Sequence, residues 1–102
     1  MVTRLNFAEA KALLDSEPSC VLLDVREEEE YITGHAVDAV LLPVDEISEQ
    51  TAREAIPTLD TPLLCYCRTG FRSRSAAHKL AQLGYTRVYD LGSLIGWPYG
   101  LE

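Results

Sequence analysis

The sequence predicts an α/β domain with a mostly parallel central sheet and helices on both faces. Short apolar runs without alternating polar positions, such as residues 21–25 and 39–42, are typical of strands buried on both faces. Segments with helical periodicity and helix-capping residues lie between these runs. Short strands that alternate with helices favour parallel pairing, because each helix returns the chain to the same end of the sheet.

Capping and helix-breaking residues define the predicted elements in chain order. Asn6, followed three residues later by Glu9, is typical of an N-cap pair and begins a helix that ends near Leu14. A short helix over residues 27–33 ends at Gly34 and has its acidic residues near the positive end of its dipole. The remaining predictions are a helix over 45–56, a strand over 63–65, a helix over 72–83, a strand over 87–89, and a turn or helix over 94–100.

The length and the apolar runs limit the class of protein. The 102 residues are predicted to form a single domain, residues 1–102, with one core that needs no disulfide or metal staple. The apolar runs are only a few residues long, whereas a membrane span needs roughly 20. The first residues contain no apolar signal-peptide core. We therefore expect a cytoplasmic protein with no membrane partner.

Charge is distributed unevenly along the chain. Sixteen acidic and nine basic residues give a net charge of −7, which disfavours nucleic acid as a partner. The acidic block over residues 27–30 is expected to be a solvated helix face. In contrast, Arg68, Arg72 and Arg74 lie close together beside Cys67. One basic cluster in an acidic protein indicates a small anionic substrate, or an anionic group carried by a partner.

The three cysteines have different expected roles. No disulfide framework is expected from an odd number of cysteines in a chain without an export signal. Cys20 is predicted to be a small buried hydrophobe, and Cys65 to be buried and passive on the same strand face as Cys67. This C-x-C pair lacks the further ligands of a structural zinc site, so neither a metal nor a cofactor is expected.

Cys67 opens a turn between the predicted strand and a helix, with the sequence Cys67-Arg68-Thr69-Gly70-Phe71-Arg72-Ser73. A helix N-terminus and neighbouring cations favour the reactive thiolate form of a cysteine. Backbone N–H groups of such a turn also form an anion-binding concavity. The segment therefore predicts a reactive cysteine that needs no histidine base. His35 is expected to be a structural hydrogen-bonding residue and His78 to face solvent.

The segment from Cys67 to Ser73 resembles the active-site loop of the rhodanese-like sulfurtransferases. Residues 23–27, 34–43 and 91–100 resemble the other signatures of that family, in the same order. The resemblance implies a rhodanese-like fold and a Cys67 persulfide that passes sulfane sulfur to a thiophilic acceptor. It implies substrate-binding roles for Arg68, Thr69, Gly70, Phe71 and Arg72, and support of the loop by Asp24, Arg26 and Ser73.

The family implies a small anionic sulfur donor such as thiosulfate, with a protein persulfide donor or a thiol acceptor as a further candidate partner. The chain departs from the family pattern at Gly92-Ser93, where a Gly-Gly pair is usual, and at Val37-Asp38, where Pro-Gly is usual. Phe71 adds an apolar ring to the loop, for which we consider ordinary packing, docking of a protein partner, or shielding of a persulfide.

Two alternative functions remain on this fold. Cysteine phosphatases and arsenate reductases have five residues between the cysteine and an arginine, and here Ser73 occupies that arginine position. Arg72 instead closes a loop that is one residue shorter and therefore better matched to one sulfur atom than to phosphate. Non-catalytic binding modules often lose the cysteine or the loop glycine, but this chain has Cys67 and Gly70. The sequence therefore favours a sulfurtransferase.

Overall fold

The structure, a computed structural model, describes residues 2–102 and contains a five-stranded sheet in which all neighbouring strands pair in parallel. The strands are β1 (Val2–Arg4), β2 (Val21–Asp24), β3 (Val40–Leu41), β4 (Leu63–Cys67) and β5 (Val88–Ser93). The helices are α1 (Phe7–Ser16), α2 (Glu28–Ile32), α3 (Glu49–Ala55) and α4 (Phe71–Gln82), with a 3-10 helix η1 (Val44–Glu46). The strand order is β1-β5-β4-β2-β3. This is the predicted fold class.

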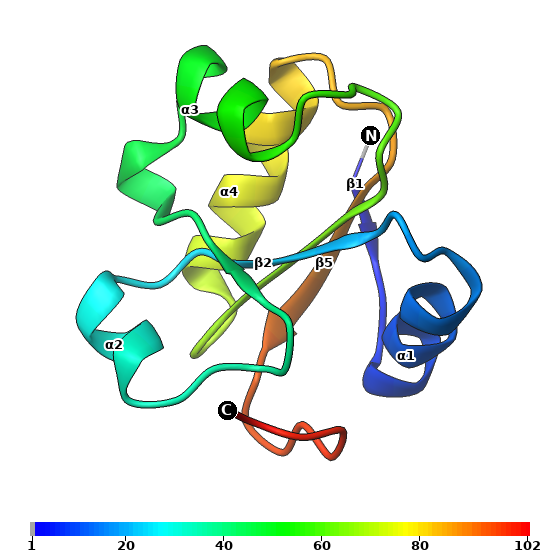
Figure 1. The fold of residues 1–102 in the computed structure, drawn as a ribbon, viewed down its shortest axis with the longest axis vertical. Helices are drawn as coiled ribbons and strands as arrows, with labels where there is room; N and C mark the ends of the chain where they lie inside the picture. Colours follow the sequence, from blue (N-terminus) through cyan, green and yellow to red (C-terminus); the bar gives the residue numbers. More distant parts are fainter. Residues whose placement is uncertain (1) are drawn as a thin grey trace.

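β4 is the middle strand, and all five of its residues are buried. Its side chains alternate between two hydrophobic clusters. Leu64 and Tyr66 pack in the cluster that includes Ala10 of α1. Cys65 and Cys67 belong to the cluster that includes residues of α3 and α4. Figure 1 shows the same arrangement, with α1 on one side of the sheet and α3 and α4 on the other. Helices therefore cover both faces, as predicted.

The carboxyl ends of the strands bring distant polar residues to one edge of the sheet. β2 ends at Asp24, β4 at Cys67 and β5 at Ser93. In the ladder, Asp24 lies beside Tyr66, and Cys67 lies beside Ser93. From this edge the chain continues from β2 toward β3 and from β4 toward β5, in opposite directions across the sheet. Ligands of open α/β sheets bind at such a switch point.

Local capping explains the helix that begins nearest the N-terminus. The Asn6 side chain accepts a hydrogen bond from the Glu9 N–H at 2.8 Å, and the Glu9 carboxylate accepts one from the Asn6 N–H at 2.9 Å. This capping box confirms the predicted start of α1, which ends two residues later than expected, at Ser16. Across residues 2–102, every helix is too short or too polar to span a bilayer.

Several predicted boundaries are wrong. The single helix over 45–56 is two helices, η1 and α3, because Ser48 forms its own N-cap with Thr51. The strand predicted over 63–65 continues to Cys67, and the strand predicted over 87–89 continues to Ser93, because these two residues still pair with each other. No strand is predicted before Asn6, yet β1 pairs with β5 there. Residues 94–100 form turns, one of the two predicted alternatives.

Candidate active site

Cys67 is the last residue of β4 and is fully buried, so it lies on the strand rather than on the turn that follows. Its Sγ accepts hydrogen bonds from the backbone N–H groups of Gly70 at 3.0 Å and Ser73 at 3.3 Å. Gly70 is the N-cap of α4 and has a φ of +104°, which glycine adopts without steric cost. The turn and the N-terminus of α4 thus direct backbone dipoles at one sulfur atom.

Two serine hydroxyls fix the shape of the loop. Ser73 is buried, and its Oγ donates to the Gly70 carbonyl at 3.1 Å. Ser93 donates from its Oγ to the Arg68 carbonyl at 2.5 Å and accepts from the Ile95 N–H at 3.1 Å. Ser93 is therefore a contact to the loop at the position where the sequence departs from the Gly-Gly pair. Its role was not predicted from the sequence.

The outer side of the loop is open to solvent. Arg68, Thr69 and Phe71 are exposed, and the Phe71 ring is 85% exposed. This exposure excludes ordinary core packing as the role of the ring. The loop therefore presents backbone N–H groups toward the buried sulfur and charged, hydroxyl and aromatic side chains toward any molecule that approaches it.

Arg72 at the end of the loop is held by an acidic residue of α2. Its guanidinium forms a bidentate ion pair with Glu30, with Nη1 2.5 Å from Oε1 and Nη2 3.0 Å from Oε2. The hydrogen bond from Arg72 lowers the pKa of Glu30 to about 2, and the same contact raises the pKa of Arg72. Glu28 and Glu29 are solvent-exposed as predicted, but the prediction of a solvated face is wrong for Glu30.

Asp24 and Arg26 form a buried network next to the loop. The Asp24 carboxylate is fully buried and accepts from the Arg26 side chain, with Nη2 2.7 Å from Oδ2, and from the Tyr66 hydroxyl at 2.6 Å. Arg26 also donates to the Gly34 carbonyl at 2.7 Å, and the Ala36 N–H donates to the Tyr66 hydroxyl at 3.1 Å. Burial and the bond to Asp24 raise the pKa of Tyr66. The network connects β2, β4 and the segment after α2.

The other cysteines and histidines lie apart from these contacts. Cys65 is fully buried as expected, and burial raises the pKa of its thiol. Cys20 is only half-buried, contrary to the prediction, and burial raises its pKa to about 11. His35 stacks on Tyr31 and its Nδ1 lies 2.9 Å from the Tyr31 carbonyl, whereas His78 is exposed. Both histidine predictions are confirmed.

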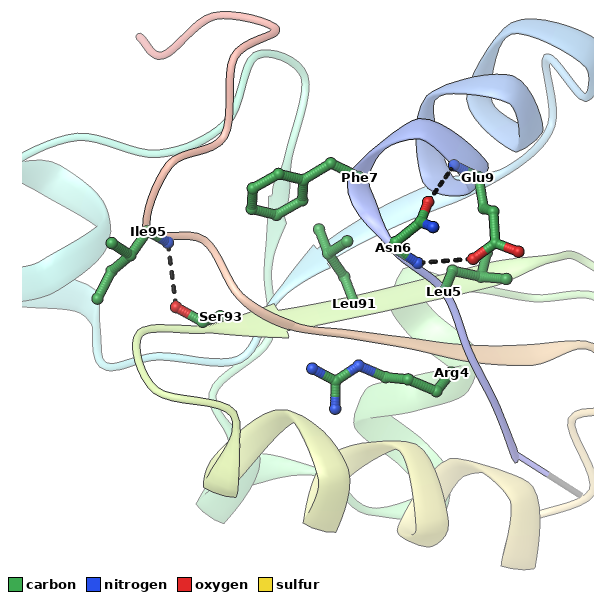
Figure 2. A pocket seen from close by; sticks show the side chains of 8 residues that line it. All are labelled: Arg4, Leu5, Asn6, Phe7, Glu9, Leu91, Ser93 and Ile95. Carbon is green, nitrogen blue, oxygen red and sulfur yellow. Dashed lines mark hydrogen bonds between the residues drawn. The ribbon is translucent and has the colours of Figure 1, made fainter.

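Two cavities lie at the edge of the sheet that carries the loop. One, of about 390 Å³, is lined by Arg26 and Arg68 together with apolar residues of the segment 94–101. A second, of about 570 Å³, lies between the start of α1 and the end of β5, and Figure 2 shows its lining side chains, including Arg4, Phe7 and Ile95. In the described part of the chain, no three His, Cys, Asp or Glu side chains come together to hold a metal ion.

Comparisons with known proteins identify the family. Residues 6–97 match the rhodanese-like domain family. The chain is 35% identical over 72 residues to thiosulfate sulfurtransferase PspE of Escherichia coli (strain K12). The aligned region covers 71% of this chain and 68% of that protein. It is 31% identical over 91 residues to tRNA uridine(34) hydroxylase of Enterobacter sp. (strain 638), covering 85% of this chain. The chain spans only 26% of that second relative.

A solved structure described as a rhodanese with anions from E. coli is similar to this one, with 28% sequence identity and a TM-score of 0.75. The match covers 81% of this chain and 96% of that chain. The family match extends over most of the sequence and includes both Asp24 and the loop from Cys67 to Arg72. The chain belongs to the rhodanese-like domain family.

Proposed function

We propose that this chain is a sulfurtransferase that moves a sulfane sulfur from thiosulfate or a persulfide donor to a thiophilic acceptor through a persulfide on Cys67. The observation that carries the proposal is the pair of N–H donors, from Gly70 and Ser73, directed at Cys67 Sγ. Such donors stabilise negative charge on sulfur. Membership of a family that includes thiosulfate sulfurtransferases supports the same reaction class.

In the first step, the Cys67 thiolate attacks the sulfane sulfur of thiosulfate. A new S–S bond forms to Cys67, the S–S bond of thiosulfate breaks, and sulfite leaves with the electron pair of that bond. Cys67 is buried, so the donor must reach it through the loop, where Arg68 and Thr69 are exposed. Arg68 also supplies positive charge for an anionic donor.

In the second step, a thiophilic acceptor attacks the outer sulfur of the persulfide. The bond between that sulfur and Cys67 breaks, and its electron pair returns to Cys67 as the thiolate. The amides of Gly70 and Ser73 face Sγ, where charge reappears when the sulfur leaves. Arg72, paired with Glu30, positions the end of the loop and adds positive charge near the sulfur. Asp24, Arg26 and Ser73 support the loop from behind.

Steady-state turnover tests the proposal against both alternatives. We expect wild type and Cys20→Ser to form thiocyanate from thiosulfate and cyanide, and Cys67→Ser to form none. Cys20 is a suitable control because it precedes β2 and lines a different cavity, which contains no residue of the Cys67 loop. Equal turnover by Cys67→Ser would overturn the proposal. Vanadate-sensitive hydrolysis of an aryl phosphate would instead indicate a phosphatase, and no turnover of either substrate would indicate a binding module.

A further inference from the structure

Arginine side chains without acidic partners gather around the Cys67 loop. Within residues 2–102, the arginines that form neither an ion pair nor a side-chain hydrogen bond are Arg4, Arg53, Arg68 and Arg74; the others pair with Asp24, Glu30 or Glu17. Three of these four unpaired arginines line cavities at the loop. In a chain with a net charge of −7, unpaired cations concentrated at one place indicate an anion site.

Arg4 and Arg74 share one of these cavities. It has a volume of about 240 Å³, and Thr69, Gly70 and Phe71 complete its lining, so no acidic side chain is present. Gly70 is also the residue whose N–H reaches Cys67 Sγ at 3.0 Å. The cavity is therefore adjacent to the sulfur position, on the solvent side of the loop.

The Arg4 side chain passes close to the backbone of β5. β1 pairs with β5 so that Arg4 lies beside Asp90, and its guanidinium passes over Gly92. A Cβ atom at Gly92 would lie 2.5 Å from Arg4 Nη2, so glycine at this position leaves space for the guanidinium, and a larger residue would displace it. Figure 2 shows Arg4 extended along the sheet, with its guanidinium directed toward the turn between β4 and α4. An arginine from the first strand thus reaches the loop.

We propose that Arg4 and Arg74 form a subsite that binds the carboxylate groups of a small thiol, the acceptor of the Cys67 sulfur. Guanidinium groups bind carboxylates through paired, charge-assisted hydrogen bonds. Thiosulfate is a compact anion that the inner amides of the loop can hold, so cations on the outer rim suit a charged group attached a few bonds away from the reacting sulfur. The inference rests on the proposed function and adds the class of acceptor.

The transfer that this subsite serves is balanced without a further reactant. The acceptor thiol gives its proton to the Cys67 persulfide, and the resulting thiolate attacks the outer sulfur and forms a new S–S bond. The S–S bond to Cys67 breaks, and its electron pair remains on Cys67 Sγ as a thiolate. The proton stays on the transferred sulfur, so the products are an acceptor hydropersulfide and the free enzyme. The carboxylates do not react and only position the acceptor thiol.

Acceptors of similar size but different charge test the assignment. The readout is the ratio of kcat/KM for 3-mercaptopropionate to kcat/KM for 2-mercaptoethanol, with thiosulfate as donor. We expect this ratio to fall about 10-fold in Arg4→Gln and in Arg74→Gln, the loss of one charge-assisted contact. Arg53→Gln is the matched control, because it also removes one positive charge. Arg53 lies near Tyr85, which follows the C-terminal end of α4, so this variant is expected to keep the wild-type ratio. An unchanged ratio in both loop variants would overturn the inference.

Binding without sulfur transfer separates this inference from the proposed function. The probe is 3-(methylthio)propionate, which has the carboxylate but no thiol, and the readout is the NMR signal of each arginine Nε–H. We expect the Arg4 and Arg74 signals to shift together and the Arg53 signal to stay in place. Shifts at Arg4 and Arg74 in a protein that takes up no sulfur would support the subsite and contradict the proposed function. Absence of shifts, or an effect of the variants only on the KM for thiosulfate, would overturn the subsite.

Discussion

At the scale of single residues, two cysteines of one strand have different surroundings. Cys65 and Cys67 lie on the same side of β4 and belong to the same hydrophobic cluster. Cys65 is paired on both sides by β2 and β5, and burial raises the pKa of its thiol. Cys67 is at the strand end, where the chain turns and two amides reach its sulfur. The end of the strand, rather than the residue type, distinguishes a candidate sulfur carrier from a core residue.

The Glu30–Arg72 ion pair gives a prediction at the same scale. In Glu30→Gln, Arg72 loses its ionised partner, and we expect sulfur uptake by Cys67 to slow about fivefold, equivalent to about 1 kcal/mol for a partly exposed pair. The measurement is the single-turnover rate of persulfide formation from thiosulfate. Glu28→Gln, an exposed residue of the same helix, is the matched control and should react at the wild-type rate.

Acid titration checks the physical cause of that effect. Because Arg72 depresses the pKa of Glu30 to about 2, the ion pair stabilises the fold above the ordinary carboxyl pKa and is lost as the pH falls toward 2. The difference in unfolding free energy between wild type and Glu30→Gln should therefore be largest near pH 7 and shrink between about pH 4.5 and 2. A difference that stays constant from pH 7 to pH 2 would contradict this explanation.

The contacts of the candidate site that could be predicted from the sequence are local ones. Cys67, Gly70 and Ser73 lie within one short segment. The predicted order of strand, turn and helix already implies that backbone N–H groups of the turn point at the cysteine, and those of Gly70 and Ser73 do so. Glu30 was missed because it is one of four consecutive glutamates, and only the packing of α2 distinguishes it from its neighbours. Arg4 was missed because its contact depends on the pairing of β1 with β5.

At the scale of elements, the buried network ties three segments together behind the loop. Tyr66 lies one residue before Cys67, and its hydroxyl joins the Asp24 carboxylate at the end of β2 to the Ala36 N–H. Arg26 extends the network to the Gly34 carbonyl. Asp24 has no exposed surface, so its carboxylate oxygens obtain their hydrogen bonds from these donors rather than from solvent. The network therefore positions the end of β4 relative to its neighbours.

Removal of one hydroxyl tests the network. In Tyr66→Phe, the Asp24 carboxylate and the Ala36 N–H each lose a partner, and we expect a loss of about 2–3 kcal/mol in unfolding free energy. Tyr85→Phe is the comparison, because its buried hydroxyl donates to a neutral acceptor, the Ile56 carbonyl, and should cost about 1 kcal/mol. Urea unfolding measures both. Equal losses in the two variants would show that the charge on Asp24 adds nothing.

Element boundaries set by neighbouring residues could be predicted from the sequence, and boundaries set by strand pairing could not. The start of α1 was predicted because both halves of its capping box, Asn6 and Glu9, lie within four residues. The break at Ser48 is also local, but weak periodicity over 45–56 masked the cap. The extension of β4 and β5 to Cys67 and Ser93 depends on pairing between strands far apart in the sequence. No local pattern reports such pairing.

At the scale of the whole molecule, one sheet separates two hydrophobic clusters. Neighbouring residues of β2 face opposite clusters, Leu22 toward α1 and Leu23 toward α3 and α4. Because both clusters include the same strands, loss of packing on either face should weaken the whole fold. We expect Leu22→Ala and Leu23→Ala each to cost about 2–5 kcal/mol and to keep a single unfolding transition. Two separate transitions by circular dichroism would contradict a shared core.

The positive charge at the loop is opposite in sign to the net charge of the whole molecule. A net charge of −7 repels small anions from most of the surface, whereas Arg4, Arg68 and Arg74 present unpaired positive charge beside Cys67. Attraction of an anionic substrate is then local to the loop. Rates with anionic substrates should consequently fall as ionic strength rises, because exposed charges are screened over about 8–10 Å at physiological salt.

The central claim is that Cys67 carries one sulfur atom, and the intact mass of the protein after incubation with thiosulfate tests it most directly. We predict that wild type and Cys20→Ser gain the mass of one sulfur atom, that Cys67→Ser gains none, and that cyanide restores the original mass. An adduct that persists in Cys67→Ser, or no adduct on the folded wild-type protein, would contradict the account.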